Sequence, residues 1–146
     1  MLPVADLVAY LSGHWTIERS LLERTTGDRG TFRGTVEYEP ADGGGLRQRE
    51  RGELVWGGHR GPAYRCLWLR PLGGPGVLEV LFEDGRDFHV LDLRTGVATA
   101  EHACGRDVYA GEFEVESAAA WAYRWTVTGP HKSLLLSSRL TRPARA

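Results

Sequence analysis

The clearest acid–base chemistry in the sequence lies in two histidines, His89 and His102. An imidazole titrates near neutral pH, so this pair could transfer protons in a reaction or bind a ligand. Tyr109 could then hold or polarise an oxygen atom of a substrate beside them. The plainer interpretation, which we favour, is that each histidine is satisfied separately by a neighbouring strand.

The other candidates are residues that could bind a polar ligand. Lys132 is the only lysine among the 18 basic residues, and a compact ammonium is not interchangeable with a planar guanidinium, although chance explains its isolation equally well. Asp107 could orient a carbonyl group or a histidine, but a structural corner is slightly favoured. Arg65 could point inward to bind an anionic group or lie outside over aromatic rings, and the sequence favours neither. Trp125, paired with Tyr123, is the best candidate for an aromatic pocket wall.

No metal or cofactor is predicted. Glu50, Asp107 and Cys104 are candidates for a third ligand beside the histidines, but the sequence has no His-x-His or His-x-x-His pair. The two cysteines, Cys66 and Cys104, lack the paired spacing of a zinc site and are expected to be reduced and half-buried. The glycines at 43–45 precede no expected helix, so they predict no nucleotide-binding loop, and no nucleophile elbow is present.

The composition excludes several classes of partner. The chain has 146 residues, of which 42% are hydrophobic and 25% charged, and its formal net charge is −1, as in a soluble globular domain. No acidic or basic block is present, so neither nucleic acid nor an anionic membrane surface is an expected partner. No apolar run approaches the length of a membrane span, and the N-terminus lacks a positive signal-peptide region. We therefore expect a cytoplasmic protein with one domain, residues 1–146.

A short helix and ten strands must position these side chains. The helix is expected over about residues 3–12, because Pro3 suits a first turn, apolar residues follow at helical spacing, and Gly13 is placed to end it. After Gly13 the hydrophobic period changes to two, which is typical of strands. The strands are expected at about 14–24, 29–39, 45–55, 62–71, 76–83, 86–93, 97–104, 107–116, 120–129 and 132–142. The pair Asp84-Gly85 gives the strongest hairpin signal, since both turn positions favour positive φ.

Ten short strands joined by tight turns predict an all-β antiparallel meander that closes into a barrel and so removes both exposed edges. A β-sandwich is the alternative. The third strand points to a hollow interior, because charged side chains from Arg47 to Glu53 occupy one face and leave Gln48 and Glu50 to face inside. An unpaired buried polar group costs about 1–3 kcal/mol, whereas a solvated or ligand-filled cavity would accommodate these two side chains.

Alternation also sorts the faces of other strands. In the hairpin around Asp84-Gly85, the more apolar face is placed inside, and it comprises Leu78, Val80, Phe82, His89 and Leu91. Phe88 belongs to the opposite face, which is placed outside. On the first strand Arg19 shares a face with Trp15 and Ile17, so it raises the same question of orientation as Arg65.

The run Gly13-His14-Trp15, directly after the expected helix, resembles the Gly-x-Trp motif of lipocalins and other calycins. Arg139 or Arg142 in the last strand matches the arginine that packs across that tryptophan in the superfamily. The resemblance implies a barrel that is closed by its first and last strands, with the N-terminal helix plugging one end.

Three longer runs resemble a bacterial and fungal family that is known only as a domain of unknown function. The runs are Phe82 to His89 (FEDGRDFH), His102 to Gly111 (HACGRDVYAG) and Trp125 to Lys132 (WTVTGPHK). Members of that family occur alone or fused to oxidoreductases, so the resemblance implies an oxidoreductase as a partner. It implies the fold and supplies no activity.

These observations predict one ten-stranded, lipocalin-like (calycin) barrel that binds a small, partly polar organic ligand in its interior. The residues expected to form the site are Gln48, Glu50, Arg65, His89, His102, Asp107, Tyr109, Trp125 and Lys132. One alternative is a small cofactor-free enzyme, an isomerase, cyclase or hydratase, in which a histidine acts as general acid or base while Tyr109 or Lys132 polarises an oxygen. Another is a haem-binding barrel of the nitrobindin kind, by analogy of fold. A homodimer is compatible with the sequence.

Overall fold

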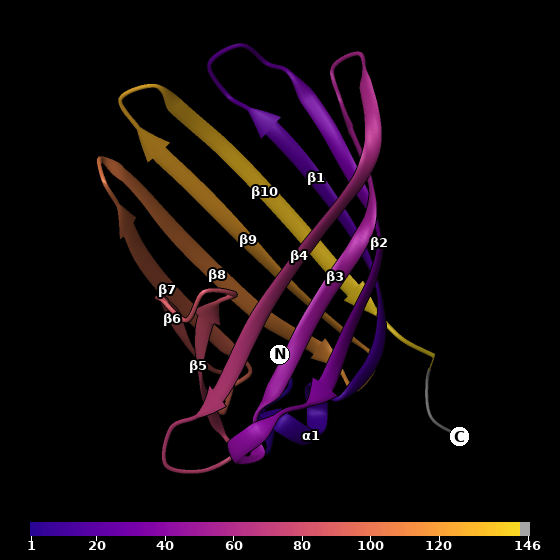
Figure 1. The fold of residues 1–146 in the computed structure, drawn as a ribbon, viewed down its shortest axis with the longest axis vertical. Coiled ribbons are helices and arrows are strands. Elements are labelled where there is room, and N and C mark those ends of the chain that lie inside the picture. The colour runs from indigo at the N-terminus through magenta and orange to yellow at the C-terminus, as the bar shows by residue number, and fades with distance from the viewer. Residues whose placement is uncertain (144–146) are drawn as a thin grey trace.

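Ten antiparallel strands and one short α-helix make up the computed structural model, which describes residues 1–143 (Figure 1). The elements are α1 (Leu7–Leu11), β1 (Gly13–Glu23), β2 (Arg29–Pro40), the 3-10 turn η1 (Asp42–Gly44), β3 (Leu46–Trp56), β4 (His59–Pro71), β5 (Val77–Phe82), β6 (Asp87–Asp92), β7 (Val97–Cys104), β8 (Asp107–Ser117), β9 (Ala120–Gly129) and β10 (Lys132–Thr141). The predicted all-β fold is confirmed, and every predicted strand lies within a few residues of an observed one.

The strands form one sheet in the order β6-β5-β4-β3-β2-β1-β10-β9-β8-β7. The first and last strands, β1 and β10, pair along their length from Thr16↔Thr141 to Glu23↔Leu134, as the calycin resemblance implied. The sheet curls into a nearly closed barrel whose two edge strands, β6 and β7, follow each other in the chain. Among the described strands no ladder joins β6 to β7, so the prediction that closure removes both edges is wrong at this seam.

The seam is open because the β5–β6 hairpin is short. Both strands have six residues, and β4 pairs with β5 only from Leu67 to Pro71. Residues 59–66 of β4 therefore have no described ladder on that side. Figure 1 shows the resulting gap in the upper part of the wall, between β4 and the strands β7 and β8.

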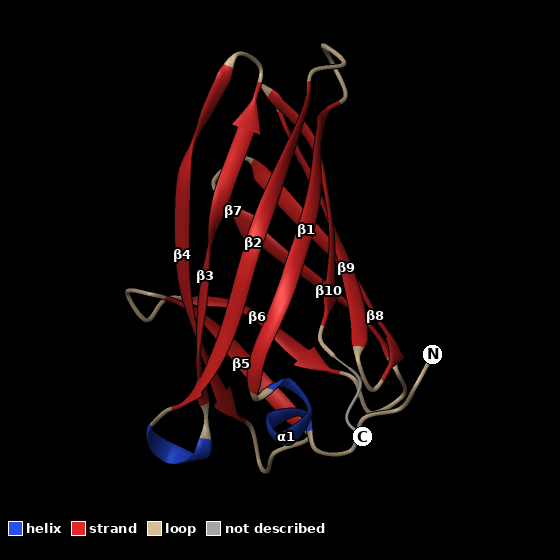
Figure 2. Ribbon diagram, turned by 90° about the vertical axis from the view of Figure 1, so that its right-hand side faces the viewer, coloured by secondary structure: helices blue, strands red, loops and turns tan. Residues whose placement is uncertain are grey.

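The N-terminal helix closes the lower end of the barrel, as expected (Figure 2), but it is shorter than predicted. It begins after Asp6, whose side chain accepts a hydrogen bond from Ala9 N at 3.0 Å. The segment before it is held in another way, since Leu2 N and Val4 N donate to the carbonyl groups of Val115 and Leu93. These tertiary hydrogen bonds exclude the first residues from the helix. No helix of residues 1–143 is long and apolar enough to span a bilayer.

Trp15 anchors the helix to the barrel. Its side chain is 2% exposed, and its indole Nε1 donates to the carbonyl oxygen of Leu11 at 2.8 Å. Of the two candidate arginines, Arg142 lies over the indole ring, with Cζ 4.0 Å from the ring centroid. Arg139 instead pairs with Glu116 on the outer surface, at 2.8 Å.

The β5–β6 hairpin departs from the prediction at its turn. Within residues 1–143 no residue other than glycine has a positive φ, so Asp84 does not adopt the expected conformation, whereas Gly85 has φ 91°. The turn spans four residues, with Phe82 N donating to the carbonyl oxygen of Arg86 at 2.8 Å. The Asp84 carboxylate accepts from Arg86 N and Nε instead, and this side-chain contact stabilises the longer turn.

A β-bulge follows in the same hairpin. Val80 pairs with His89 and Leu81 pairs with Asp87, which leaves Phe88 as the extra residue. Because a bulge places consecutive side chains on the same side of a strand, Phe88 joins His89 against the interior and is 7% exposed. The prediction that Phe88 faces outward is therefore wrong.

Candidate functional site

Arg19 on β1 and Glu50 on β3 form an ion pair inside the barrel, across β2, which lies between these two strands in the sheet. Arg19 Nη1 lies 2.7 Å from Glu50 Oε1, and Nη2 lies 3.0 Å from Oε2. The remaining Arg19 donors reach Ser138 Oγ at 2.7 Å and the Tyr123 hydroxyl at 2.9 Å. The sequence expectation that Gln48 and Glu50 face inward is confirmed, since they are 7% and 4% exposed.

The environment of this pair keeps both partners charged. Burial alone would raise the pKa of the Glu50 carboxyl group, but the hydrogen bonds from Arg19 and the charges of Arg65 and Arg19 outweigh it and lower that pKa. Burial would likewise lower the pKa of Arg19, but Tyr123 and Glu50 outweigh this effect and raise it. Glu50 is therefore a carboxylate at neutral pH, and its oxygens are already occupied by a bidentate partner.

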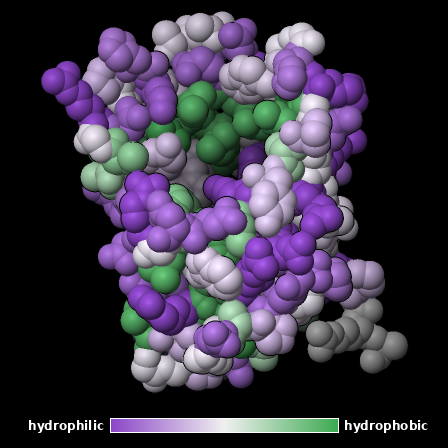
Figure 3. Space-filling model, viewed as in Figure 1, coloured by the Kyte–Doolittle hydropathy of each residue, from purple (hydrophilic) through white to green (hydrophobic). Residues whose placement is uncertain are grey.

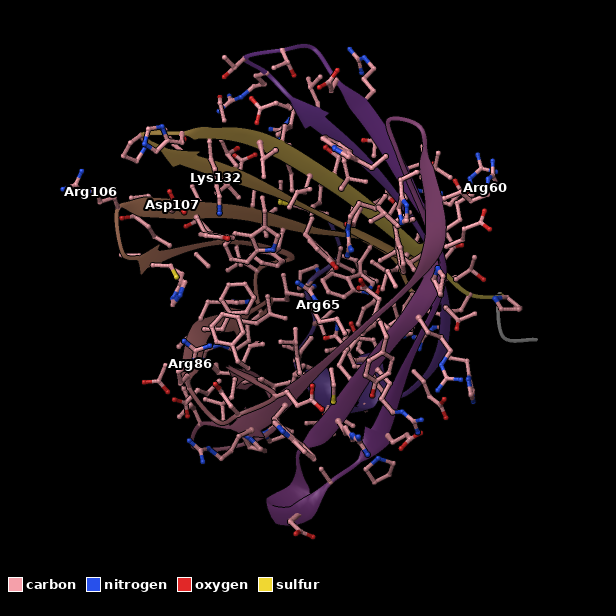
Figure 4. The ribbon with its side chains drawn as sticks, turned by 45° about the horizontal axis from the view of Figure 1, so that its top comes forward. Arg60, Arg65, Arg86, Arg106, Asp107 and Lys132 are labelled. Carbon is pink, nitrogen blue, oxygen red and sulfur yellow. The ribbon has the colours of Figure 1, made fainter. Side chains whose placement is uncertain are left out.

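Arg65 is the second guanidinium in this region, and it resolves the question that the sequence left open. It lies opposite Glu50 in the β3–β4 ladder and points into the barrel (Figure 4). Its Nη2 is 3.9 Å from Glu50 Oε2, beyond hydrogen-bond distance, and its side chain is 41% exposed. Its Nε is buried and has no hydrogen-bond partner within residues 1–143.

A cavity of about 230 Å³ lies above these charges. Its lining consists of Arg19, Leu21, Phe32, Glu50, Leu54, Ala63, Tyr64, Arg65, Tyr123, Trp125 and Leu136. Figure 3 shows a hollow on this face of the molecule, with apolar side chains around it. The aromatic pair expected in a pocket wall, Tyr123 and Trp125, lies in this lining. Gly111 permits the position of Trp125, since a Cβ at Gly111 would come within 2.9 Å of the indole ring.

The two histidines, His89 and His102, both contact the ring of Phe88, and no contact between the two imidazoles is found among the described residues. Phe88 lies 4.8 Å from His89 and 5.4 Å from His102 between ring centroids, and it stacks on Trp125 at 5.0 Å. Burial lowers the pKa of His89 to about 4, with smaller contributions from the charges of Arg65 and His102. His89 is therefore neutral at physiological pH, with Nδ1 3.3 Å from the Val90 carbonyl oxygen.

Little space remains beside His89. The cavity there measures about 30 Å³ and is lined by Gln48, Phe88, Trp125 and other core side chains. A volume of this size holds one or two water molecules, so no haem plane fits against His89. Among residues 1–143, no three His, Cys, Asp or Glu side chains gather closely enough to hold a metal ion.

Asp107 and Lys132 form an ion pair at the rim of the barrel, away from the cavity lining (Figure 4). Lys132 Nζ lies 3.3 Å from Asp107 Oδ2, and this contact raises the pKa of Lys132. A Cβ at Gly129 would clash with Asp107 Oδ1, so the carboxylate packs directly on the backbone there. Asp107 therefore contacts the end of β9 through Gly129 and the start of β10 through Lys132. Tyr109 lies inside the rim, with its ring 6.1 Å from that of His102.

Sequence reasoning left out two residues of this region. The orientation of Arg19 was left open and the residue was not assigned to the site, although its alternation with Trp15 and Ile17 was a usable signal. Phe88 gave no signal, because its orientation depends on the bulge. Both cysteines are free thiols, but their burial differs from the half-buried positions expected, since Cys66 is buried and Cys104 is exposed.

A larger depression of about 780 Å³ lies across β1, β2 and β7–β10, where most of its lining side chains belong to the outer face. Two charged groups of its lining, Arg124 and Glu112, pair with each other at 2.6 Å, and Arg139 pairs with Glu116, which lies outside the lining, at 2.8 Å. Exposed pairs of this kind are ordinary surface contacts. The interior cavity therefore remains the better candidate site, since the Arg19–Glu50 pair in its lining is buried.

Solved structures with the same architecture are distant in sequence. The chain is similar to a protein of unknown function from the DUF3598 family of Nostoc punctiforme, with a TM-score of 0.65 and 12% identity over 97% of this chain and 52% of that one, so it spans about half of that protein. It is similar to the S-type phycobiliprotein lyase CPES from Guillardia theta, with a TM-score of 0.61 and 10% identity over 95% and 92%. It is also similar to EF1p2_mFAP2b bound to DFHBI, with a TM-score of 0.52 and 13% identity over 95% and 98%.

At these identities the likeness shows the fold, a calycin-like barrel, and nothing of the activity. No curated protein matches the chain in sequence. Residues 11–142 match the family model DUF6314, a family of unknown function, and the chain therefore belongs to that family.

Proposed function

We propose that this protein binds a small, partly polar organic molecule in the cavity above the Arg19–Glu50 pair. The observation that carries this proposal is a buried, charged cluster at the base of an otherwise apolar cavity. A buried ion pair is weak evidence for stability, because well-packed apolar residues often stabilise a core equally well or better. A polar recognition group at the base of an apolar pocket is what binding of a small molecule requires.

The size of the cavity limits the ligand. A volume of about 230 Å³ is below the roughly 300–1,000 Å³ typical of pockets for drug-sized ligands, so one or two rings or a short branched chain would fill it. The hollow on the face shown in Figure 3 would give a ligand access to the cavity. A barrel of similar fold, EF1p2_mFAP2b, is bound to DFHBI. This precedent supports the proposal that a barrel of this kind binds a small molecule.

Binding is better supported than catalysis. His89, His102 and Tyr109 are absent from the cavity lining, and His89 is packed among aromatic rings. Of the other predicted ligand-binding residues, Glu50, Arg65 and Trp125 line the cavity, whereas Gln48 lies beside the small cavity below. The proposed binding function therefore rests on Arg65, Glu50 and Trp125.

Filling the cavity tests the proposal. We expect Leu136→Trp, which places an indole in the cavity, to abolish binding of fragment-sized aromatic compounds that raise the melting temperature of the wild-type protein. Leu135→Trp is the matched control, because Leu135 is the next residue on β10 and is absent from the lining. Fragment binding that survives in Leu136→Trp, or a library with no binder, would overturn the proposal.

A further inference from the structure

We propose that the ligand of this cavity carries one negative charge and that Arg65 binds this charge. The apolar part of the ligand then lies against the apolar lining, which includes Leu21, Leu54 and Leu136. The inference rests on the proposed binding function and adds the charge and orientation of the ligand. Its basis is the charge balance of the cavity and the unsatisfied hydrogen-bonding capacity of one guanidinium.

The charge balance is positive. Within residues 1–143, the charged side chains that line the cavity are Arg19, Glu50 and Arg65. Glu50 neutralises one of the two guanidinium groups, and His89, which lies below, is neutral at physiological pH. One positive charge therefore remains in a partly desolvated space, where it attracts an anion more strongly than it would in water.

The geometry assigns this remaining charge to Arg65. Arg19 makes four hydrogen bonds, two of them to Glu50. Arg65 has only the 3.9 Å approach to Glu50, and its buried Nε lacks a partner among the described residues. A planar guanidinium presents paired donors that match a carboxylate, so an incoming carboxylate would supply the missing acceptors.

The walls define the rest of the ligand. Above the charges, the lining is aliphatic and aromatic, with Leu21, Leu54 and Leu136 on three different strands and Trp125 on a fourth. An apolar group of the ligand is favoured there, because its binding removes from water both its own hydrocarbon surface and that of the cavity wall. The ligand class that fits is a small monocarboxylate with an aromatic or branched aliphatic body.

Matched acids and amides test the charge. We would measure the affinities of 1-naphthoate and 1-naphthamide, and of benzoate and benzamide, by calorimetry near neutral pH. The wild-type protein should prefer each acid by about tenfold or more, the factor for one charge-assisted hydrogen bond. Arg65→Met should remove this preference while leaving the affinity for the amides nearly unchanged. Arg60→Met is the control, because Arg60 lies on the same strand but pairs with Glu53 at 2.6 Å on the exposed rim.

The outcomes separate the two proposals. Amides that bind as tightly as the acids would overturn the inference and leave the binding function intact, as would an acid preference that survives in Arg65→Met. Failure of all four probes to bind would overturn both. The Nε–Hε resonance of Arg65 in the wild-type protein provides a readout that needs no variant: it should shift with 1-naphthoate and not with 1-naphthamide, and an unmoved resonance would also overturn the inference.

Discussion

His89 should make the fold sensitive to mild acid. Its pKa is about 4 in the folded protein, against 6.5 for an exposed histidine, so the unfolded chain binds a proton at a pH where the folded one does not. Its stabilising contribution is therefore complete above about pH 6.5 and is lost as the pH falls towards 4. Between pH 7.5 and pH 5.0, this difference removes about 2 kcal/mol from the free energy of unfolding.

Replacing the titratable ring by Phe isolates this effect. His89→Phe keeps an aromatic ring against Phe113 and Trp125, which lie 5.3 Å and 5.2 Å from the imidazole between centroids. We expect the wild-type protein to lose about 2 kcal/mol more than His89→Phe between the two pH values, measured by urea unfolding. Any constant cost of the substitution cancels, because each protein is compared with itself.

The control is His131→Phe, which removes an exposed histidine from the β9–β10 turn. This variant should keep the acid sensitivity of the wild-type protein. If His89→Phe loses as much stability as the wild-type protein on acidification, the burial of a neutral His89 is refuted.

Three further substitutions test the contacts around the barrel. Glu50→Gln leaves Arg19 buried without its counter-ion, so urea unfolding should show a loss of about 3 kcal/mol, and a loss below about 1 kcal/mol would contradict the buried pair. Gly129→Ala should lower the stability by about 1–3 kcal/mol through the clash with Asp107, and combining it with Asp107→Ala should recover most of the loss if the contact is as described. Arg142→Met should cost about 1 kcal/mol by removing the cation from the indole beneath it, and it should change the tryptophan emission; unchanged emission would argue against that contact.

The strands were predictable because their determinants are local. Alternation with a period of two and the turn residues between segments placed ten strands, and the charged face from Arg47 to Glu53 correctly turned Gln48 and Glu50 inward. The pairing of the first and last strands, which the structure contains, is not local, and it was implied by the resemblance of Gly13-x-Trp15 to the calycin motif. The alternation and the turn residues depend on neighbours in the chain, which a single sequence displays.

The wrong predictions concern features, such as the bounds of the helix and the orientation of side chains, that depend on contacts between distant segments of the chain. The hydrogen bonds of Leu2 and Val4 to remote carbonyl groups shorten the helix, and no helical pattern could reveal them. The bulge at Phe88 reverses one side chain because the register of the β5–β6 ladder shifts between Val80 and Leu81. The orientation of Arg65 was undecided because its strand has large side chains on both faces. Its partner Glu50 lies on another strand, so only the folded barrel brings the two together.

The most direct test of a ligand-binding interior is the set of intermolecular nuclear Overhauser effects between 1-naphthoate and leucine methyl groups. Leu21 and Leu136 line the cavity, whereas their chain neighbours Leu22 and Leu135 do not. The account predicts contacts from the naphthyl protons to Leu21 and Leu136. Contacts confined to Leu22 and Leu135, or no contact with any of the four, would contradict it.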